Sequence, residues 1–201
     1  MQGNVHHADA STFTTTTDKS QVYETAISSA VALFESQRFW ATNLANTASL
    51  MWHAFDALGM HVNWAGFYVV QLRRWQKHSD ADTEGDKELE GDKRGGKRTL
   101  MLGPFMGKVA CQTINFGHGV CGTAAEAGRT IVVPDVEKFP GHIACDGSTK
   151  SEVVVPILDD AGAVRGVLDV DCLVLNGFDE TDVQFLESLA GLIGRSCEWD
   201  L

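Results

Sequence analysis

Hydrophobic residues recur at helical spacing through the first third of the chain. Side chains three and four positions apart share one side of an α-helix, so this pattern predicts amphipathic helices with one buried face. A break near Gln37 divides the pattern into two helices within residues 22–58, and Gly59 is expected to end the second one as a C-cap. The apolar positions are Val22, Ala26, Ala30, Leu33 and Phe34, then Trp40, Leu44, Met51, Phe55 and Leu58.

After the second helix the pattern changes to short extended segments. Apolar and β-branched residues dominate these segments, and turn-forming residues separate them, as is typical of β-strands. The predicted strands span residues 63–72, 99–104, 130–135, 151–158 and 164–172. The last two are close enough in sequence to form a hairpin around residues 159–162.

A further helical pattern closes the chain. Asp179 is expected to cap this helix, because its side chain can accept hydrogen bonds from the first backbone N–H groups. The apolar stripe of the helix consists of Val183, Leu186, Leu189, Ala190 and Ile193. Helices at both ends of a run of strands predict an α+β fold, with a central antiparallel sheet and the N- and C-terminal helices packed on one face.

Polar stretches interrupt this pattern. Residues 73–98 are rich in Asp, Glu, Lys and Gly and cannot bury enough apolar surface to fold, so we predict a charged mobile insertion. Residues 1–20 contain four consecutive threonines and are predicted to be a flexible tail. Residues 139–150 read as a loop. The predicted helices and strands are expected to form a single domain over residues 21–201, with the insertion and the loop inside it.

The net charge, the apolar runs and the N-terminal residues of the chain indicate which partners and which compartment to expect. The 201 residues carry a formal net charge of −11, which argues against binding to nucleic acid or to an anionic membrane, because like charges repel. No apolar run is long enough to span a bilayer. The first residues lack the basic start and apolar core of a secretory signal. We therefore expect a cytoplasmic protein with reduced thiols.

Cys111, Cys121 and Cys145 lie close together among glycines and histidines. In a reducing compartment, clustered cysteines more often bind metal or exchange electrons than form structural disulfides. The pair His118-x2-Cys121 has the residue types of a zinc site, and a second such pair is His142-x2-Cys145. A histidine beside a loop cysteine also favours a reactive thiolate. The spacing of these residues leaves both alternatives open.

The predicted hairpin gathers three carboxylates. Asp169 and Asp171 are two apart on one strand and therefore share a face. If the loop is residues 161–162, Glu152 lies opposite Asp171, and if it is residues 160–161, Glu152 lies opposite Asp169. A three-residue loop, or a bulge at Pro156, would break this arrangement.

Three adjacent carboxylates repel one another, so in a partly buried site at least one is expected to have a raised pKa and to act as a general acid or to hold an ammonium group. The alternative is an exposed polar face of the sheet. Trp64 and Tyr68 lie four apart on the first strand and also share a face. They are candidates for the wall of a pocket, or for ordinary core residues.

Several segments together resemble the free methionine-(R)-sulfoxide reductases, which are enzymes built on a single GAF domain. The resemblance covers about residues 23–193. Its segments are NWAGFY at 63–68, GVCGTA at 119–124, PGHIACD at 140–146, SEVVVPI at 151–157 and GVLDVD at 166–171. The charged insertion, the Thr-rich tail, Cys172 and Cys197 depart from the pattern. We expect these last two cysteines to be buried and inert.

The resemblance implies a role for each candidate residue. Cys145 corresponds to the catalytic cysteine, and Cys111 and Cys121 to the other redox cysteines, with Cys111 as the resolving partner. The remaining correspondences are the active-site acids Glu152, Asp169 and Asp171, the aromatic wall of Trp64 and Tyr68, and backbone amides near Ile143, Ala144 and Cys145 for the substrate carboxylate.

The implied reaction is thiol-dependent reduction of free L-methionine (R)-sulfoxide through sulfenic acid and disulfide intermediates. Thioredoxin would be the electron donor, with no bound cofactor and no metal, and the chain would form a homodimer. Two alternatives stay open: a GAF sensor that binds a small ligand such as a cyclic nucleotide, and a cysteine/histidine zinc domain. The sensor would be favoured by tight binding of a cyclic nucleotide without sulfoxide turnover. The zinc domain would be favoured by stoichiometric zinc in the purified protein.

Overall fold

The computed structural model describes residues 13, 16, 18–70, 98–142 and 146–199 of the chain. Most of the predicted tail and nearly all of the predicted insertion at 73–98 lie outside the described residues. The same holds for residues 143–145, which include the candidate nucleophile. In the part of the chain that is described, no helix is both long and apolar enough to cross a membrane.

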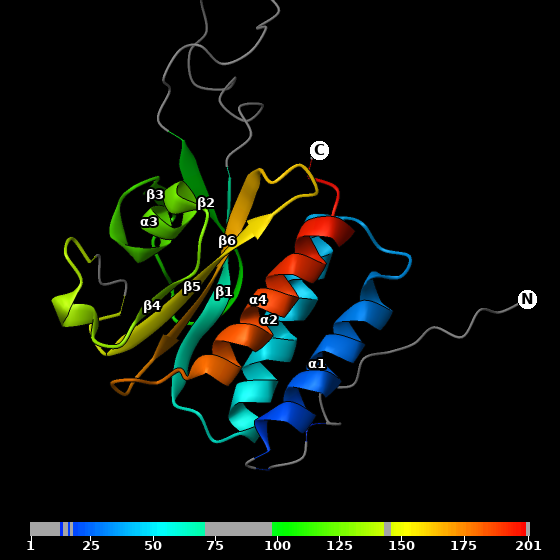
Figure 1. The fold of residues 1–201 in the computed structure, drawn as a ribbon, viewed down its shortest axis with the longest axis horizontal. Helices are drawn as coiled ribbons and strands as arrows, with labels where there is room; N and C mark the ends of the chain where they lie inside the picture. Colours follow the sequence, from blue (N-terminus) through cyan, green and yellow to red (C-terminus); the bar gives the residue numbers. More distant parts are fainter. Residues whose placement is uncertain (1–12, 14–15, 17, 71–97, 143–145, 200–201) are drawn as a thin grey trace, which may run out of the picture.

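Three long helices lie side by side on one face of the sheet (Figure 1). They are α1 (Lys19–Phe34), α2 (Trp40–Ala57) and α4 (Glu180–Ser196). The break near Gln37 and the helix cap at Asp179 are confirmed. Asp179 forms a capping box with Asp182, in which each side chain accepts a hydrogen bond from the other residue's backbone N–H. Gly59 follows α2 in the left-handed conformation, with φ of 65°, as expected for a residue that ends a helix.

Six strands form a single sheet in the order β3-β2-β1-β6-β5-β4, and every neighbouring pair is antiparallel. Their bounds are β1 Val62–Val70, β2 Thr99–Gly107, β3 Thr113–Asn115, β4 Ile131–Val133, β5 Ser151–Leu158 and β6 Val164–Cys172. The α+β fold with helices against an antiparallel sheet is therefore confirmed. The short strand β3 was not predicted.

The alternation of side chains along each strand gives the sheet two buried faces. On β1, Ala65 and Phe67 belong to the core beneath the three long helices. Trp64 and Tyr68 point the other way, into a second core that contains α3 (Gly119–Ala127). Figure 1 shows α3 on the opposite side of the sheet from the three long helices. The fold thus has a layer on each face.

The hairpin of β5 and β6 has the first of the two registers expected. Glu152 lies opposite Asp171, as a loop at residues 161–162 predicts. The turn is longer than two residues, because the N–H of Asp159 donates to the carbonyl of Ala163. A bulge between Ile157 and Leu158 compensates for the longer turn. No irregularity falls at Pro156, which continues the ladder.

Candidate active site

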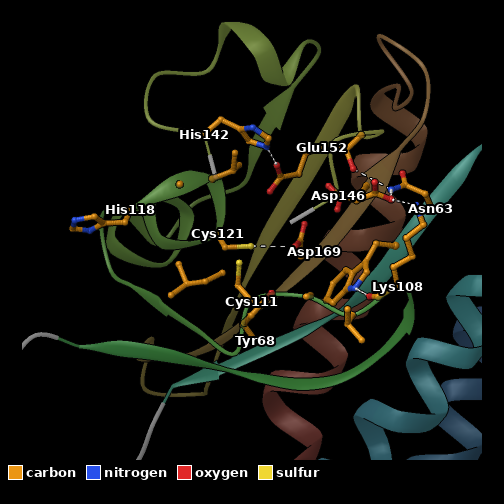
Figure 2. A pocket seen from close by; sticks show the side chains of 18 residues that line it. Asn63, Tyr68, Lys108, Cys111, His118, Cys121, His142, Asp146, Glu152 and Asp169 are labelled. Carbon is orange, nitrogen blue, oxygen red and sulfur yellow. Dashed lines mark hydrogen bonds and ion pairs between the residues drawn. The ribbon is translucent and has the colours of Figure 1, made fainter. Parts of the chain in front are cut away.

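A pocket lies between α3 and the face of the sheet that carries Trp64 and Tyr68 (Figure 2). Its empty volume, open solvent at the mouth included, is about 630 Å³. The loop after β2 and the residues on either side of positions 143–145 complete its walls. The pocket brings together Cys111, Cys121, Glu152, Asp169 and Asp171, which are five of the predicted catalytic residues.

The three carboxylates share the pocket face of the hairpin. Glu152 and Asp169 are each 6% exposed. Burial raises the pKa of the Glu152 carboxyl to about 7, a rise that the contact with His142 opposes and the charge of Asp171 increases. Burial also raises the pKa of Asp169 and of Asp171 well above the ordinary value, and in each case a neighbouring carboxylate adds to the shift. The cluster therefore retains protons near neutral pH, which a general acid requires.

Cys121 approaches this cluster from the first turns of α3. Its thiol donates a hydrogen bond of 3.2 Å to Oδ2 of Asp169. Burial raises the pKa of the thiol well above its usual range, and the charges of Asp169 and Glu152 raise it further. The other oxygen of Asp169, Oδ1, is buried and has no hydrogen-bond partner among the described residues. A buried acceptor without a donor is costly, so this atom is suited to receive a ligand group.

Helix α3 was not predicted from the sequence. Residues 108–128 were described only as a segment that contains glycines and cysteines. Position 122 in this helix requires a glycine, because a Cβ there would collide with the carbonyl oxygen of Asn115 on β3. The close approach places the helix against the sheet edge. Gly128 then ends α3 in the left-handed conformation, with φ of 60°. The local signal for the helix was this C-terminal glycine after an Ala-rich run.

From the sequence, His142 was considered as a zinc ligand and as the histidine that could favour a thiolate at Cys145, and its contact with Glu152 was missed. Its Nε2 lies 3.5 Å from Oε2 of Glu152, and only 16% of its side chain is exposed. His118 lies at the rim, where its Nδ1 is 3.0 Å from the carbonyl oxygen of Phe116. Figure 2 shows the His118 ring directed away from Cys121. His118 is therefore not directed at Cys121, as the first zinc pair requires, and the second pair includes Cys145, which lies outside the described residues.

Trp64 and Tyr68 form one wall of the pocket. Their rings are stacked with centroids 5.8 Å apart, and Phe105 stacks on the other side of Trp64 at 5.3 Å. The indole Nε1–H of Trp64 donates to the carbonyl oxygen of Lys108. The wall is thus held in place by packing and by one directional bond.

A polar network near the mouth of the pocket was also missed. Lys108 Nζ lies 2.9 Å from Oδ2 of Asp146, and Asn63 donates to Oγ1 of Thr149 at 3.0 Å. The pKa of Asp146 falls to about 2, first because the backbone N–H of Ser148 donates to it and then because Lys108 lies beside it. This ion pair joins the loop before Cys111 to the first described residue after Cys145. The signal in the sequence was the position of Asp146 directly after the candidate nucleophile.

Two of the other cysteines lie in the core, as expected. Cys172 and Cys197 are buried in the core beneath the long helices, as predicted. Cys111 is half-buried and lines the pocket. The predicted residues Ile143, Ala144 and Cys145 lie outside the described part of the chain.

The chain resembles known proteins over nearly its whole length. Residues 45–196 match the family model for the GAF domain. A free methionine-R-sulfoxide reductase from Saccharomyces cerevisiae is 47% identical over 96% of this chain and 94% of its own length. The chain belongs to the free methionine-R-sulfoxide reductase family.

Solved structures show that the similarity to the free methionine-R-sulfoxide reductases includes the three-dimensional fold. A GAF domain structure is 46% identical, with a TM-score of 0.81, and the match covers 98% of this chain and 99% of that one. A free methionine-R-sulfoxide reductase from Neisseria meningitidis, solved with its substrate, is 37% identical with a TM-score of 0.71, over 91% of this chain and 92% of that one. The predicted GAF fold and the predicted oxidoreductase class are confirmed.

Proposed function

We propose that this chain reduces free L-methionine (R)-sulfoxide to methionine, with Cys145 as the nucleophile and thioredoxin as the electron donor. Membership of the reductase family supports the reaction. The structural observation that carries the proposal is the cluster of the buried Glu152 and Asp169 with the half-buried Asp171, whose raised pKa values keep acidic protons beside an aromatic wall.

The chemistry needs an acid because sulfoxide sulfur is a poor electrophile. The Cys145 thiolate attacks this sulfur while a carboxyl group of the cluster protonates the sulfoxide oxygen. The oxygen passes to Sγ of Cys145 as the bond between the two sulfur atoms breaks, so the cysteine becomes a sulfenic acid and methionine leaves as the two-electron reduced product. Glu152 is the acid that the proposal favours, because its pKa of about 7 lies near the working pH.

A second cysteine then closes the cycle. Its thiol attacks the sulfenic sulfur, water leaves, and a disulfide forms that a thioredoxin dithiol reduces. Cys111 is half-buried at the pocket, whereas Cys121 is only 5% exposed and holds its proton. These differences support Cys111 as the resolving partner and Cys121 as a donor of a hydrogen bond to Asp169.

The pocket also offers complementary groups for an amino acid. The unsatisfied Oδ1 of Asp169 suits the substrate ammonium group, and Asp171 lies on the same strand face. The stacked rings of Trp64 and Tyr68 suit the S-methyl group, which is apolar. We assign the substrate carboxylate to backbone amides at residues 143–145, as the family resemblance implies.

The proposal is tested by a coupled thioredoxin assay on the separated R and S sulfoxides of free methionine, beside a peptide-bound sulfoxide. Turnover is expected for the free R form only. Cys145→Ser is expected to abolish turnover, whereas Cys197→Ser, whose side chain lies in the core away from the pocket, should retain it. Undiminished turnover by Cys145→Ser would overturn the assignment of the nucleophile, and tight cyclic-nucleotide binding without turnover would favour a sensor.

A further inference from the structure

Cys121, Glu152 and Asp169 come from three different elements and converge in the pocket. Cys121 lies on α3, Glu152 on β5 and Asp169 on β6. One donor atom of each, a sulfur and two carboxylate oxygens, lies within 4.8 Å of the other two, and all three side chains are buried. Figure 2 shows them directed toward one another. We propose that the reduced protein binds one soft divalent cation such as Zn²⁺ at these three side chains, and that the bound cation excludes the sulfoxide substrate.

An observation independent of the clustering points to a ligand at this place. Oδ1 of Asp169 is buried and has no hydrogen-bond partner among the described residues. Only Oδ2 of the same carboxylate is used, by the Cys121 thiol at 3.2 Å. A buried carboxylate oxygen without a donor costs free energy unless something positive binds it, and a cation between the three side chains does so.

The donor set selects the class of metal. Thiolate sulfur prefers Zn²⁺ and Cd²⁺, whereas Mg²⁺ and Ca²⁺ prefer sites made of oxygen alone. Three protein donors leave the fourth tetrahedral position to water, which can enter because the pocket opens to solvent. On binding, the cation displaces the thiol proton of Cys121 and the protons that Glu152 and Asp169 carry, and all of these protons pass to solvent.

The neighbours of the three donors suit the same site. His142 Nε2 lies 3.5 Å from Oε2 of Glu152 and can orient this carboxylate from the far side, as outer-shell partners of metal ligands do. Asp171 lies opposite Glu152 across the hairpin and places a third carboxyl group beside the three donors. These neighbours therefore help to fix the positions of the ligands.

The competition with substrate rests on the proposed function, whereas the cation site itself does not. The same carboxylates that would hold the substrate ammonium group and protonate the sulfoxide would be occupied by the metal. Zn²⁺ is therefore expected to act as a competitive inhibitor of turnover, and a chelator should restore the activity.

The cation site is tested by binding alone. We expect reduced wild-type protein to bind one Zn²⁺ in competition with a chromophoric chelator, and one Cd²⁺ with a near-ultraviolet thiolate-to-metal band. Cys121→Ser should remove the band. Asp169→Asn, which is nearly isosteric, should weaken the binding by more than about 100-fold, beyond the roughly 10–100-fold loss typical of an outer-shell partner. The thermal unfolding of each apo variant shows whether it is folded.

Matched cysteine variants separate this site from other thiols. Cys197→Ser is a control because Cys197 lies in the other core. Cys111→Ser and Cys145→Ser keep all three proposed ligands and should bind the cation as the wild type does. Loss of binding in Cys145→Ser, or unchanged binding in a folded Asp169→Asn variant, would overturn the site.

The outcomes for the two proposals are distinguishable. Cys145→Ser is expected to be inactive but to bind Zn²⁺, so cation binding can be confirmed even if the wild type shows no sulfoxide turnover. An active wild type that binds no Zn²⁺ would overturn the cation site and leave the reductase intact. Cation binding that does not raise the KM for the sulfoxide would overturn the exclusion of substrate.

Discussion

The thiol of Cys121 lies 3.2 Å from Oδ2 of Asp169 and donates a hydrogen bond to it. This contact joins α3 to β6 at the base of the pocket. Because the thiol is buried and faces carboxylates, its pKa is raised well above the usual range, with burial as the largest cause. Cys121 is therefore a protonated donor at neutral pH, which distinguishes it chemically from a cysteine that attacks a substrate.

Alkylation should reveal this difference between the pocket cysteines. We expect iodoacetamide at pH 7 to label Cys121 at least about tenfold more slowly than the half-buried Cys111, because the thiolate is the reactive form and Cys121 is buried. Mass spectrometry of reduced protein after short labelling measures both rates. Cys197, also 5% exposed, reports global unfolding, and in denaturant all sites should label alike. Equal rates for Cys121 and Cys111 in folded protein would contradict the assignment.

The raised pKa of Glu152 makes the stability of the fold depend on pH. The pKa is about 7 in the folded protein against an ordinary 4.5, so the folded state favours the protonated form. The stabilising contribution is complete below about pH 4.5 and is lost as the pH rises through 7. At about 1.4 kcal/mol per pKa unit, the loss is on the order of 3 kcal/mol.

Urea unfolding of the wild type and of Glu152→Gln between pH 5 and 9, values chosen to bracket a pKa of about 7, measures this effect. The neutral amide cannot ionise, so the variant should lose less stability than the wild type as the pH rises. Asp179→Asn, at the exposed cap of α4, is a suitable carboxylate control remote from the pocket. Parallel stability curves for the wild type and Glu152→Gln would show that Glu152 ionises normally.

His142 should set the alkaline limit of the activity. Its contact with Glu152 lowers the pKa of that carboxyl, so removing the imidazole should raise the pKa. If protonated Glu152 is the general acid, His142→Gln should move the alkaline limb of the kcat profile to higher pH. His53→Gln, on the exposed side of α2, is the matched control. An alkaline limb that stays in place, with only the maximal rate reduced, would mean that His142 acts in some other way.

The shared face of the three carboxylates could be predicted from the sequence because a single strong rule governs it, whereas the choice between the two registers could not. Asp169 and Asp171 are two apart, so they share a face in any register, and both of the registers considered place Glu152 beside them. The rule does not predict the length of the turn, which is longer than two residues and is compensated by a bulge after Ile157. Local sequence does not determine where a ladder absorbs an extra residue.

Helix α3 and the polar contacts around the pocket could not be predicted in the same way. The helix has nine residues and two glycines, so its stability comes from packing on the sheet rather than from intrinsic propensity. The pairs Lys108–Asp146 and His142–Glu152 join residues that are distant in sequence or on opposite sides of a loop. Such contacts depend on the tertiary fold, which a pattern of apolar positions does not encode.

The aromatic wall should act on substrate affinity more than on the chemical step. Trp64→Ala removes the ring that is stacked between Tyr68 and Phe105, so we expect the KM for free methionine sulfoxide to rise by about tenfold or more, equivalent to roughly 1.4 kcal/mol. Trp64→Phe keeps an apolar ring and should retain most of the affinity while losing the bond to Lys108. Steady-state kinetics on folded variants measures both, and an unchanged KM in Trp64→Ala would remove this ring from the substrate site.

Two glycines of α4 provide a matched test of how this helix packs on the sheet. A Cβ at Gly194 would collide with the carbonyl oxygen of Leu158 on β5, whereas a Cβ at the exposed Gly191 would meet nothing closer than Arg195 Nη1 at 3.5 Å. Gly194→Ala should therefore lower the free energy of unfolding by roughly 1–3 kcal/mol, as overpacking typically does. Gly191→Ala should raise the free energy of unfolding by about 0.5–1 kcal/mol, because alanine has a higher helix propensity than glycine. Urea unfolding of the two variants measures both changes, and equal effects would show that α4 does not press on β5 at Gly194.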